Sequence, residues 1–221
     1  MHPDWLSNAF VVADREGGSA VFVDSGADVA PLLAAVEAWG ATPAVVLRTH
    51  SHSDHVVHED ELRARFGIDV VAEPGRWEWG DLRVRGFATP GHSDDMVAFV
   101  VDDEVVFSGD TLFKDAVGGT RDDFEGVRHS VMDVLMALPP ETRVLPGHTD
   151  ETTIGREWER NPFVRVWRGI EPEGTEAVRV GGRDATLVVW SPDYDGKGKA
   201  WVRFDDGTDA IVGGSRVTRS G

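Results

Sequence analysis

Cysteine is absent from this chain of 221 residues. Disulfides, thiolate metal ligands and a cysteine nucleophile are therefore excluded. Basic residues are also scarce, because 22 Lys and Arg stand against 39 Asp and Glu, giving a formal net charge of −17. Nucleic-acid-binding proteins usually present a basic face to the phosphate backbone. We therefore expect no nucleic-acid partner.

Long apolar runs are missing as well. The longest ones, such as residues 97–101, are far shorter than the roughly 20 residues that a membrane-spanning helix needs. The first ten residues, MHPDWLSNAF, have neither the basic segment nor the apolar core of a secretory signal. These absences predict a cytoplasmic protein without a membrane partner. Apolar residues make up 41% of the chain and charged residues 28%, the balance of a folded globular protein.

The first 169 residues alternate between strand-like and helix-like patterns. Strands are predicted over residues 9–13, 19–24, 44–49, 69–72, 82–89, 96–101, 105–108 and 143–145. Helices are predicted over residues 29–39, 56–66 and 124–138, with stop signals at Gly40, Gly67 and the pair Pro139-Pro140. Strands interleaved with helices favour an α/β fold built in layers.

The pattern changes after residues 160–162. Short apolar runs at 178–180, 185–190, 200–204 and 210–212 are separated by turn-forming stretches such as SPDYDGKG and DDGTD, with no helical stretch. This arrangement predicts a small closed all-β barrel. The predicted domains are therefore an α/β catalytic domain over residues 1–169 and a β-barrel domain over residues 175–221.

The segment THSHSDH, residues 49–55, holds four side chains that can ligate a metal ion. On an extended chain His50 and His52 project to the same side, because side-chain direction alternates along a strand. Asp54 continues that face, and His55 turns toward a second point if a helix begins there. Imidazoles combined with carboxylates suit zinc, iron or manganese.

Three further residues of the same kind, His92, Asp110 and His148, lie in loops that contain glycine and follow predicted strands. Loops at strand ends can hold such side chains rigidly around a common point. A lone histidine is more often structural than a ligand, but seven ligand-type side chains in this arrangement predict a metal site. We interpret His58 as a solvated residue and His129 as part of a helix.

The sequence resembles the metallo-β-lactamase superfamily in four successive motifs. They are THSHSDH, PGHSDDMVAF, FSGDTLF and LPGHTDETTIGREWERNPF. Within that superfamily the chain is most similar to the glyoxalase II (hydroxyacylglutathione hydrolase) branch, over residues 8–165. The resemblance implies an α/β fold, the αββα metallo-β-lactamase sandwich, with the site at one edge.

The resemblance also implies a site for two divalent metal ions, with zinc favoured and iron or manganese as alternatives. One ion would be held by His50, His52 and His92. The other would be held by Asp54, His55 and His148, with Asp110 as the bridge. Asp54 and Asp110 would be the catalytic carboxylates. Two such ions can share a hydroxide that attacks a carbonyl carbon at neutral pH. The implied activity is hydrolysis of a small-molecule acyl thioester or ester.

The chain departs from the glyoxalase II pattern in two places. That branch carries a basic residue soon after the bridging Asp, where this chain has Gly119, with Arg121 two residues later. Its C-terminal helical region is replaced here by the β-rich tail, whose segment 200–207 resembles the central hairpin of Tudor-like barrels. Glutathione is therefore not the expected carrier. The tail is expected to shield the site or to form a homodimer interface.

Three other functions fit the same residues. A persulfide dioxygenase of this fold would bind a single iron through His50, His92 and Asp110. A lactonase would keep all seven ligands, but such enzymes place a tyrosine near the metals, and the single tyrosine, Tyr194, lies in the tail. A non-enzymatic binding protein would use the tail and keep the metal as a structural element, although structural sites are usually closed by four ligands.

Overall fold

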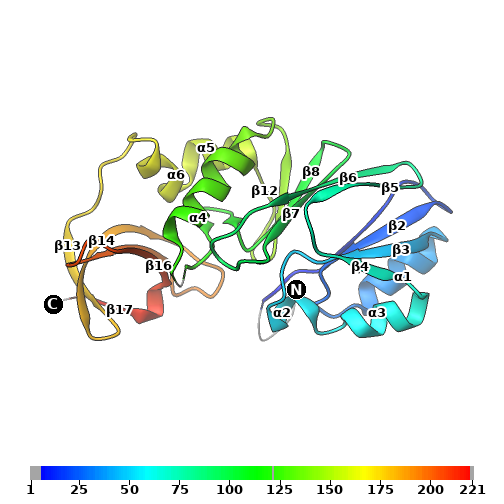
Figure 1. The fold of residues 1–221 in the computed structure, drawn as a ribbon, viewed down its shortest axis with the longest axis horizontal. Helices are drawn as coiled ribbons and strands as arrows, with labels where there is room; N and C mark the ends of the chain where they lie inside the picture. The colour runs from blue at the N-terminus through cyan, green and yellow to red at the C-terminus, as the bar shows by residue number, and fades with distance from the viewer. Residues whose placement is uncertain (1–5, 121, 220–221) are drawn as a thin grey trace.

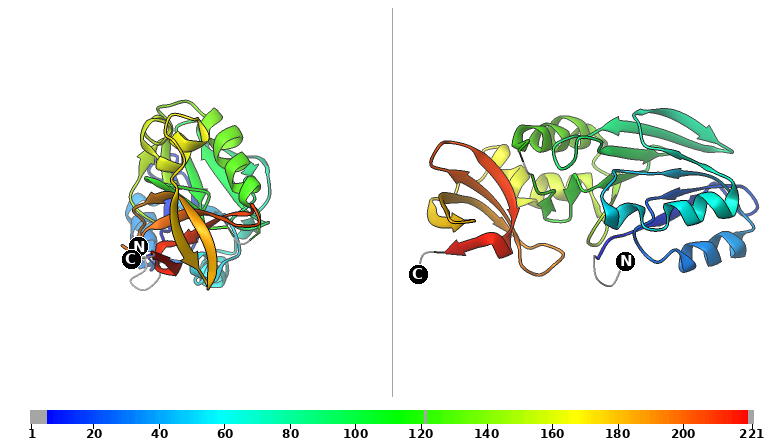
Figure 2. Two further views of the ribbon diagram at one scale, coloured as in Figure 1. Left: turned by 90° about the vertical axis from the view of Figure 1, so that its left-hand side faces the viewer. Right: turned by 60° about the horizontal axis from the view of Figure 1, so that its bottom comes forward.

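The computed structural model describes residues 6–120 and 122–219. Two β-sheets lie face to face, and a third sheet lies at one end of the molecule (Figure 1, Figure 2). Helices cover the outer faces of the two facing sheets (Figure 1). In the described residues, no helix has the length and apolar character needed to cross a membrane.

The first sheet has the strand order β1-β2-β3-β4, in which β1 is antiparallel to β2 and the other neighbours are parallel. Its strands are β1 (Phe10–Ala13), β2 (Ser19–Val23), β3 (Thr42–Leu47) and β4 (Asp69–Val71). Side chains alternate along β2: Val21 and Val23 pack toward the second sheet, whereas Phe22 packs toward the helices. Those helices are α1 (Ala30–Trp39) and α3 (Glu59–Phe66).

The second sheet has the order β12-β11-β8-β7-β6-β5, in which β8 and β11 pair in parallel and the other neighbours pair antiparallel. Its strands are β5 (Gly75–Trp79), β6 (Leu82–Ala88), β7 (Val97–Val101), β8 (Val105–Gly109), β11 (Arg143–Pro146) and β12 (Thr152–Thr153). Phe99 packs against the first sheet, and its neighbours Ala98 and Val100 pack against the outer helices. Both faces of β7 are buried, which explains its unbroken apolar sequence.

The outer helices of this half are α4 (Phe124–His129), which continues as a π-helical turn (Ser130–Val134) and a 3₁₀ turn (Leu135–Ala137), then α5 (Ile154–Arg160) and α6 (Pro162–Trp167). A small antiparallel pair, β9 (Leu112–Phe113) and β10 (Ala116–Val117), follows β8 and precedes α4 in the chain. The layers therefore run helix, sheet, sheet, helix. The predicted α/β sandwich is confirmed.

Several predicted elements differ from the observed ones. The helix predicted over 56–66 corresponds to α3 and begins three residues later than predicted, after a separate short helix, α2 (Ser53–Val56). The helix predicted over 124–138 changes its helical form twice. The sequence did not indicate β5, because its polar residues alternate on an exposed face. It also missed α5 and α6, which meet at Asn161-Pro162. The Asn161 side chain accepts hydrogen bonds from the first amides of α6, so a new helix begins there.

The C-terminal sheet is antiparallel throughout, with the order β16-β15-β14-β13-β17. Its strands are β13 (Glu176–Val180), β14 (Arg183–Ser191), β15 (Lys199–Phe204), β16 (Asp209–Gly213) and β17 (Val217–Arg219). One face encloses an apolar core of its own, which includes Val178, Leu187 and Val202. The all-β character predicted for the tail is thus confirmed, but the sheet is a curled half-barrel with β16 and β17 at its two edges, not the closed barrel that the sequence predicts. Its likeness to Tudor barrels stays a prediction.

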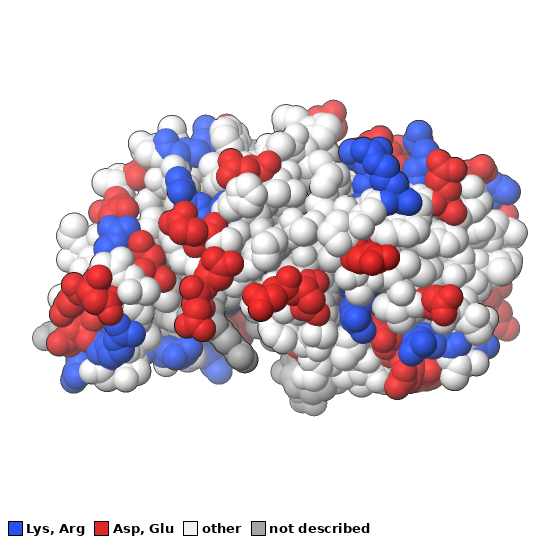
Figure 3. Space-filling view, viewed as in Figure 1, with Lys and Arg blue, Asp and Glu red and all other residues white. Residues whose placement is uncertain are grey.

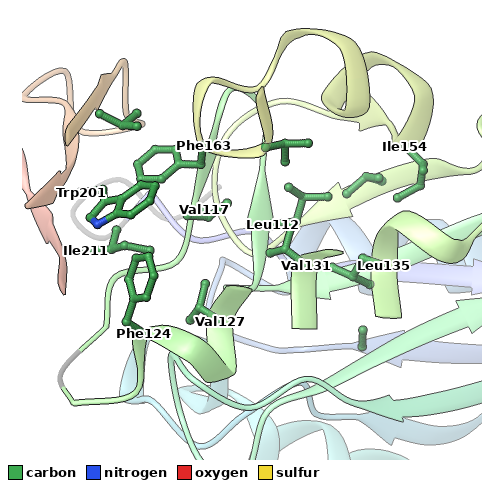
Figure 4. Packing of buried hydrophobic residues seen from close by; sticks show 14 of the residues in the cluster. Leu112, Val117, Phe124, Val127, Val131, Leu135, Ile154, Phe163, Trp201 and Ile211 are labelled. Carbon is green, nitrogen blue, oxygen red and sulfur yellow. The ribbon is translucent and has the colours of Figure 1, made fainter. Parts of the chain in front are cut away.

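The other face of this sheet packs against the two-sheet sandwich and its outer helices. Trp201 and Ile211 lie in one buried cluster with Phe124 and Phe163, as Figure 4 shows. A register shift between Leu187 and Val189 marks a β-bulge in β14. The bulge lets the consecutive residues 188 and 189 both join this cluster. The sheet is therefore continuous with the main core rather than separated from it.

Candidate metal centre

The structure brings all seven predicted ligand residues together in one ligand cluster. Their side chains form two groups of three joined through Asp110. The first group is His50, His52 and His92, and the second group is Asp54, His55 and His148. Within each group the candidate ligand atoms lie within 4.8 Å of one another, and so do those of His50, His55 and Asp110.

The spacing within the first group fits a small metal ion. The His52 Nδ1 atom lies 2.9 Å from His50 Nε2 and 3.1 Å from His92 Nε2. With metal–nitrogen bonds of about 2.0–2.1 Å, two ligands of a tetrahedral ion are about 3.3 Å apart. The three imidazoles therefore already lie close to the separation that such an ion imposes.

Asp110 touches histidines of both groups. Its Oδ1 atom lies 3.4 Å from His55 Nε2, and its Oδ2 atom lies 3.4 Å from His148 Nε2 and 3.5 Å from His92 Nε2. In the second group, Asp54 Oδ2 lies 3.4 Å from His148 Nε2. This central position is the one that a bridging carboxylate requires.

Strand ends position the ligands. β3 leads into His50, and α2 begins at Ser53, so Asp54 and His55 lie on a helical turn and reach the second group. β8 ends at Gly109, whose φ of 49° turns the chain into Asp110. Loops after strands of both sheets thus meet at one edge of the sandwich.

The outward ring nitrogens of three histidines are fixed by oxygen atoms. His55 Nδ1 lies 2.8 Å from Asp24 Oδ2, and His148 Nδ1 lies 3.0 Å from the Leu6 carbonyl oxygen. His92 Nδ1 lies 2.9 Å from the carbonyl oxygen of Gly119. Histidines that bind metals usually donate their second N–H in this way, which fixes the tautomer and the ring orientation.

Asp24 organises the start of the ligand segment. It is buried at the end of β2 and accepts hydrogen bonds from the Thr49 amide (2.7 Å) and the Thr49 hydroxyl (2.8 Å). Together with its contact to His55, these bonds tie both ends of the segment 49–55 to one carboxylate. The sequence did not single out Asp24 or Leu6, because neither belongs to a ligand motif.

The metal-free cluster is strongly polarised. Burial lowers the pKa of His55 and of His148, but the Asp110 carboxylate outweighs it and raises these pKa values to about 11 and about 9. Burial lowers the pKa of His50 to about 4. Burial raises the pKa of Asp110, yet His148 and His55 hold it well below its usual range. The buried Asp110 carboxylate is therefore stabilised by positive charge close to it. Protonated His55 and His148 provide that charge in the metal-free protein, and divalent cations can replace their protons.

Two buried atoms of the cluster lack a hydrogen-bond partner among the described residues: His55 Nε2 and Asp110 Oδ1. Such atoms are rare in folded proteins and call for an explanation. Gly147 lies against the same two side chains, since a Cβ there would be 2.3 Å from Asp110 Oδ1. Glycine thus keeps space open beside unpaired ligand atoms, so the residues present fit a divalent cation at this point.

The chain is similar to proteins of known fold. A search against models of protein families finds no match. Among solved structures, it matches the BLEG-1 B3 metallo-β-lactamase with a TM-score of 0.67 and 27% identity, over 74% of this chain and 96% of that one. It matches ETHE1 from Myxococcus xanthus with a TM-score of 0.64 and 30% identity, over 72% of this chain and 80% of that one.

Two further matches cover similar parts of the chain. TTHA1623, solved in a di-iron-bound form, has a TM-score of 0.61 and 30% identity, over 74% of this chain and 98% of that one. A hydroxyacylglutathione hydrolase of Acidiphilium cryptum is 36% identical over 156 residues, which are 63% of each chain. The protein belongs to the metallo-β-lactamase superfamily. The resemblance to its glyoxalase II branch is also confirmed, at the level of sequence similarity.

About a quarter of this metallo-β-lactamase-fold protein has no counterpart in the matched structures, although two of them are covered almost completely. The C-terminal sheet makes up a similar share of the chain. It nevertheless reaches the ligand cluster, because Tyr194, in the loop between β14 and β15, stacks on His148. The ring centroids are 4.1 Å apart and the ring planes differ by 8°.

The position of Tyr194 corrects one argument from the sequence. Tyr194 lies in the tail, but it is part of the site and not remote from it. Burial raises the pKa of its hydroxyl above the usual range, and the nearby carboxylates of Asp110, Asp193 and Asp54 raise it further. The argument against a lactonase, that no tyrosine lies near the metal ligands, therefore no longer holds. His58 and His129 lie outside the ligand cluster and pair with surface carboxylates of Glu61 and Asp133.

A cavity of about 240 Å³ opens on this metallo-β-lactamase-fold site. It is lined by two ligands and by residues of the loops 91–94 and 122–123, namely His52, Gly91, His92, Ser93, Asp94, Asp122 and Asp123. Acidic side chains also occupy the middle of the molecular face drawn in Figure 3. The approach to the ligand cluster is therefore negatively charged.

Proposed function

We propose that this protein is a metal-dependent hydrolase that cleaves a thioester or an ester and binds two divalent ions, zinc foremost, through the seven clustered residues. The observation that carries the proposal is the position of Asp110, whose carboxylate contacts His92 of the first group and both His55 and His148 of the second group. When bound, the two ions would make hydroxide available at neutral pH and stabilise the negative charge that develops on the substrate carbonyl.

We assign different roles to the two aspartates, Asp110 and Asp54. Asp110 has a side chain that is 8% exposed and holds histidines of both groups in register, so it acts mainly by fixing the separation of the groups. Asp54 has a side chain that is 26% exposed. It is therefore the carboxylate that a bound substrate would approach, and it can accept a proton there. Asp24 keeps the ring of His55 oriented through the 2.8 Å contact to Nδ1.

The test combines metal content with hydrolysis by the full-length protein. We expect about two ions per chain, and turnover of members of a thioester and ester panel. Asp110→Asn should lose at least one ion and nearly all turnover, because both groups depend on that carboxylate. Asp133→Asn, an exposed acid paired with His129, is the matched control and should behave as the wild type. Full turnover by Asp110→Asn would refute the proposal.

We further propose that the leaving group is uncharged or cationic and that glutathione is not the carrier. The cavity beside His52 and His92 is lined by three aspartates, and none of its described lining residues is lysine or arginine. Arg121, the basic residue nearest in sequence to the position of the family's carrier-binding residue, lies outside the described residues. Residues 91–95 and 118–125 together hold five acidic residues and one basic residue, so this entrance carries excess negative charge.

The carrier proposal is tested with three thioesters of one acyl group whose leaving thiols are anionic, neutral and cationic. We expect the anionic thioester to have the lowest kcat/KM. The difference should shrink at high salt, because counterions screen charges on the surface. Asp94→Asn together with Asp122→Asn should narrow the difference, whereas Asp60→Asn on α3 should not. A preference for the anionic thioester at low salt would contradict the carrier proposal.

A persulfide dioxygenase is the second candidate. The match to ETHE1 from Myxococcus xanthus, at 30% identity, fits this function as well as the first. His50, His92 and Asp110 would then hold one iron, with positions left open for the reactants. One iron per chain, oxygen uptake with a persulfide and no hydrolysis would decide for this function over the first.

Lactone hydrolysis gains support from Tyr194, whose ring lies on His148. Lactones therefore belong in the substrate panel beside the thioesters. Turnover of lactones alone would favour this reading of the same ligand cluster. A non-enzymatic metal protein would hydrolyse none of these compounds.

The remaining sequence-based expectations are proposals as well. The separate apolar core of the C-terminal sheet supports domains at 1–169 and 175–221. The strand order and the 3₁₀ turn between β16 and β17 support a Tudor-like small barrel. A homodimer through this sheet would appear as twice the 24.1 kDa chain mass in solution. A cytoplasmic location also stays a prediction.

A further inference from the structure

We propose that the C-terminal sheet is a built-in part of the metal centre, in which Tyr194 is a positioning residue that holds His148 in its ligating orientation. This inference rests on the proposed function, because it concerns the same ligand cluster. It goes beyond that function by assigning a role to the C-terminal sheet, which holds none of the seven clustered residues.

His148 is held from several directions. Its Nδ1 atom bonds to the Leu6 carbonyl oxygen, and its Nε2 atom faces Asp54 and Asp110. Hydrogen bonds to ring nitrogens act along the plane of the ring, so these contacts restrain motion perpendicular to that plane only weakly. Tyr194 restrains that motion by stacking face to face on the imidazole at 4.1 Å. Phe113 adds an edge-on contact with its centroid 5.8 Å from His148 and 6.0 Å from Tyr194.

The loop that carries Tyr194 is itself fixed. The Asp193 carboxylate pairs with the Lys199 ammonium at 2.9 Å, and both side chains are nearly fully buried, at 3% and 8% exposed. The Lys199 ammonium also lies 5.6 Å from the ring centroid of Tyr194 and 5.7 Å from that of Phe113. Separating Asp193 from Lys199 would leave an uncompensated buried charge, which is strongly unfavourable, so both side chains are held in place. The pair closes the loop on both sides of Tyr194, so the ring has little room to move.

A second contact reaches the first group. The Thr120 amide donates to the Ile211 carbonyl oxygen at 2.8 Å, and the Ile211 amide donates to the Thr120 hydroxyl at 3.0 Å. Thr120 follows Gly119, whose carbonyl oxygen fixes His92 Nδ1. β16 therefore supports the peptide that orients His92, while the loop before β15 supports His148.

The apolar interface makes these contacts rigid. Trp201 on β15 and Ile211 on β16 pack against Phe124 and Phe163 of the catalytic part (Figure 4). The Trp201 ring centroid lies 4.9 Å from that of Phe124. Displacing the sheet would expose this cluster to water, so the sheet and the ligand loops move as one unit. The loop between β14 and β15 extends from the sheet toward the middle of the molecule (Figure 2).

The test measures metal affinity, not turnover, in full-length variants. His52→Ala weakens the first group and leaves the second group intact, so it isolates the second ion. In that background, Tyr194→Leu should lower the affinity for the remaining ion about tenfold or more, as loss of a partner that orients a ligand does. Tyr194→Phe keeps the stacked ring and should stay within about twofold. Competition with a chelator gives both numbers.

Several controls keep the result clear. Trp39→Leu, a similar change at an exposed aromatic of α1, should leave metal affinity unchanged. If Tyr194→Leu does not fold, as judged by thermal melting, the paired change Asp193→Asn and Lys199→Gln loosens the same loop and should also weaken the second ion. Wild-type affinity in Tyr194→Leu, or equal losses in Tyr194→Leu and Tyr194→Phe, would overturn the positioning role.

The outcome is separable from that of the proposed function. If Tyr194→Leu loses the second ion while the wild type hydrolyses no ester or thioester, the hydrolase proposal fails and the positioning role stands. If the wild type hydrolyses such a substrate and Tyr194→Leu binds metal normally, the reverse holds.

Discussion

Gly147 precedes His148 and lies directly against the ligand cluster. A Cβ at this position would be 2.3 Å from Asp110 Oδ1 and 2.6 Å from His55 Cε1, whereas ordinary van der Waals contact begins at 3.4 Å. Going from 2.3 to 3.4 Å requires a relative displacement of about 1.1 Å between Asp110 and residue 147. Both neighbours are buried, so neither can withdraw into solvent. Bond lengths in metal sites tolerate only about 0.2 Å of change.

Gly147→Ala is therefore expected to lower metal affinity by about 100-fold or more. It should also lower the free energy of unfolding of the metal-free protein by about 1–3 kcal/mol, the usual range for overpacking. Chelator competition measures the first effect and urea denaturation the second. Gly213→Ala is the matched control, because its φ is −60° and its Cβ would meet only Ser215 Oγ at 3.8 Å. Normal metal binding by Gly147→Ala would refute the close packing on which the argument depends.

Four other predictions rest on contacts and charges of the same structure. Asp24→Asn should weaken metal binding about 10–100-fold, because it alters the partner that orients His55, and chelator competition checks this. Because the pKa values of His148 and His55 are raised to about 9 and 11, these two groups should stabilise the folded metal-free protein most below pH 6.5. That stabilisation is lost as the pH rises through 9 and then 11, so the urea midpoint should fall. The same protonation predicts release of about two protons per chain on full metal loading at pH 7.5, measured by calorimetry in two buffers, and no release would contradict it. Glu157→Leu should lower the free energy of unfolding by about 3 kcal/mol or more, because the buried carboxylate accepts bonds from the Thr152 hydroxyl, the Asp115 amide and the Asn161 side chain; a urea midpoint unchanged from the wild type would contradict this.

Much of the ligand cluster could be predicted because its residues lie in short sequence motifs directly after predicted strands. His50, His52, Asp54 and His55 lie within six residues, and the other three ligands follow strands whose apolar patterns are plain. A strand end fixes the direction of the next few residues, so motifs placed there meet predictably. The alternation along β2 and β7 likewise follows from the two-sided burial of those strands.

The residues that support the ligands could not be predicted in this way. Asp24 lies in no motif and reaches His55 only because β2 and β3 are neighbours in the first sheet. The partner of His148 is a main-chain oxygen at Leu6, to which the identity of the side chain contributes nothing. The sequence places Tyr194 in the tail but does not show that the tail reaches the site. The C-terminal sheet packs through a β-bulge in β14, which the alternation of apolar residues does not reveal. Such long-range contacts are set by the assembled fold.

The distances along the chain between these partners have a consequence for how the protein matures. His92 and the carbonyl group that orients it, on Gly119, are both made early in synthesis. His148 needs an oxygen 142 residues behind it and a tyrosine 46 residues ahead of it. Because a nascent chain emerges from the ribosome with its N-terminus first, all seven clustered residues are made before Tyr194, which stacks on His148, and before Ile211, which bonds to Thr120 beside Gly119. Both groups of the ligand cluster therefore gain their full support only once β15 and β16 have been synthesised and have docked.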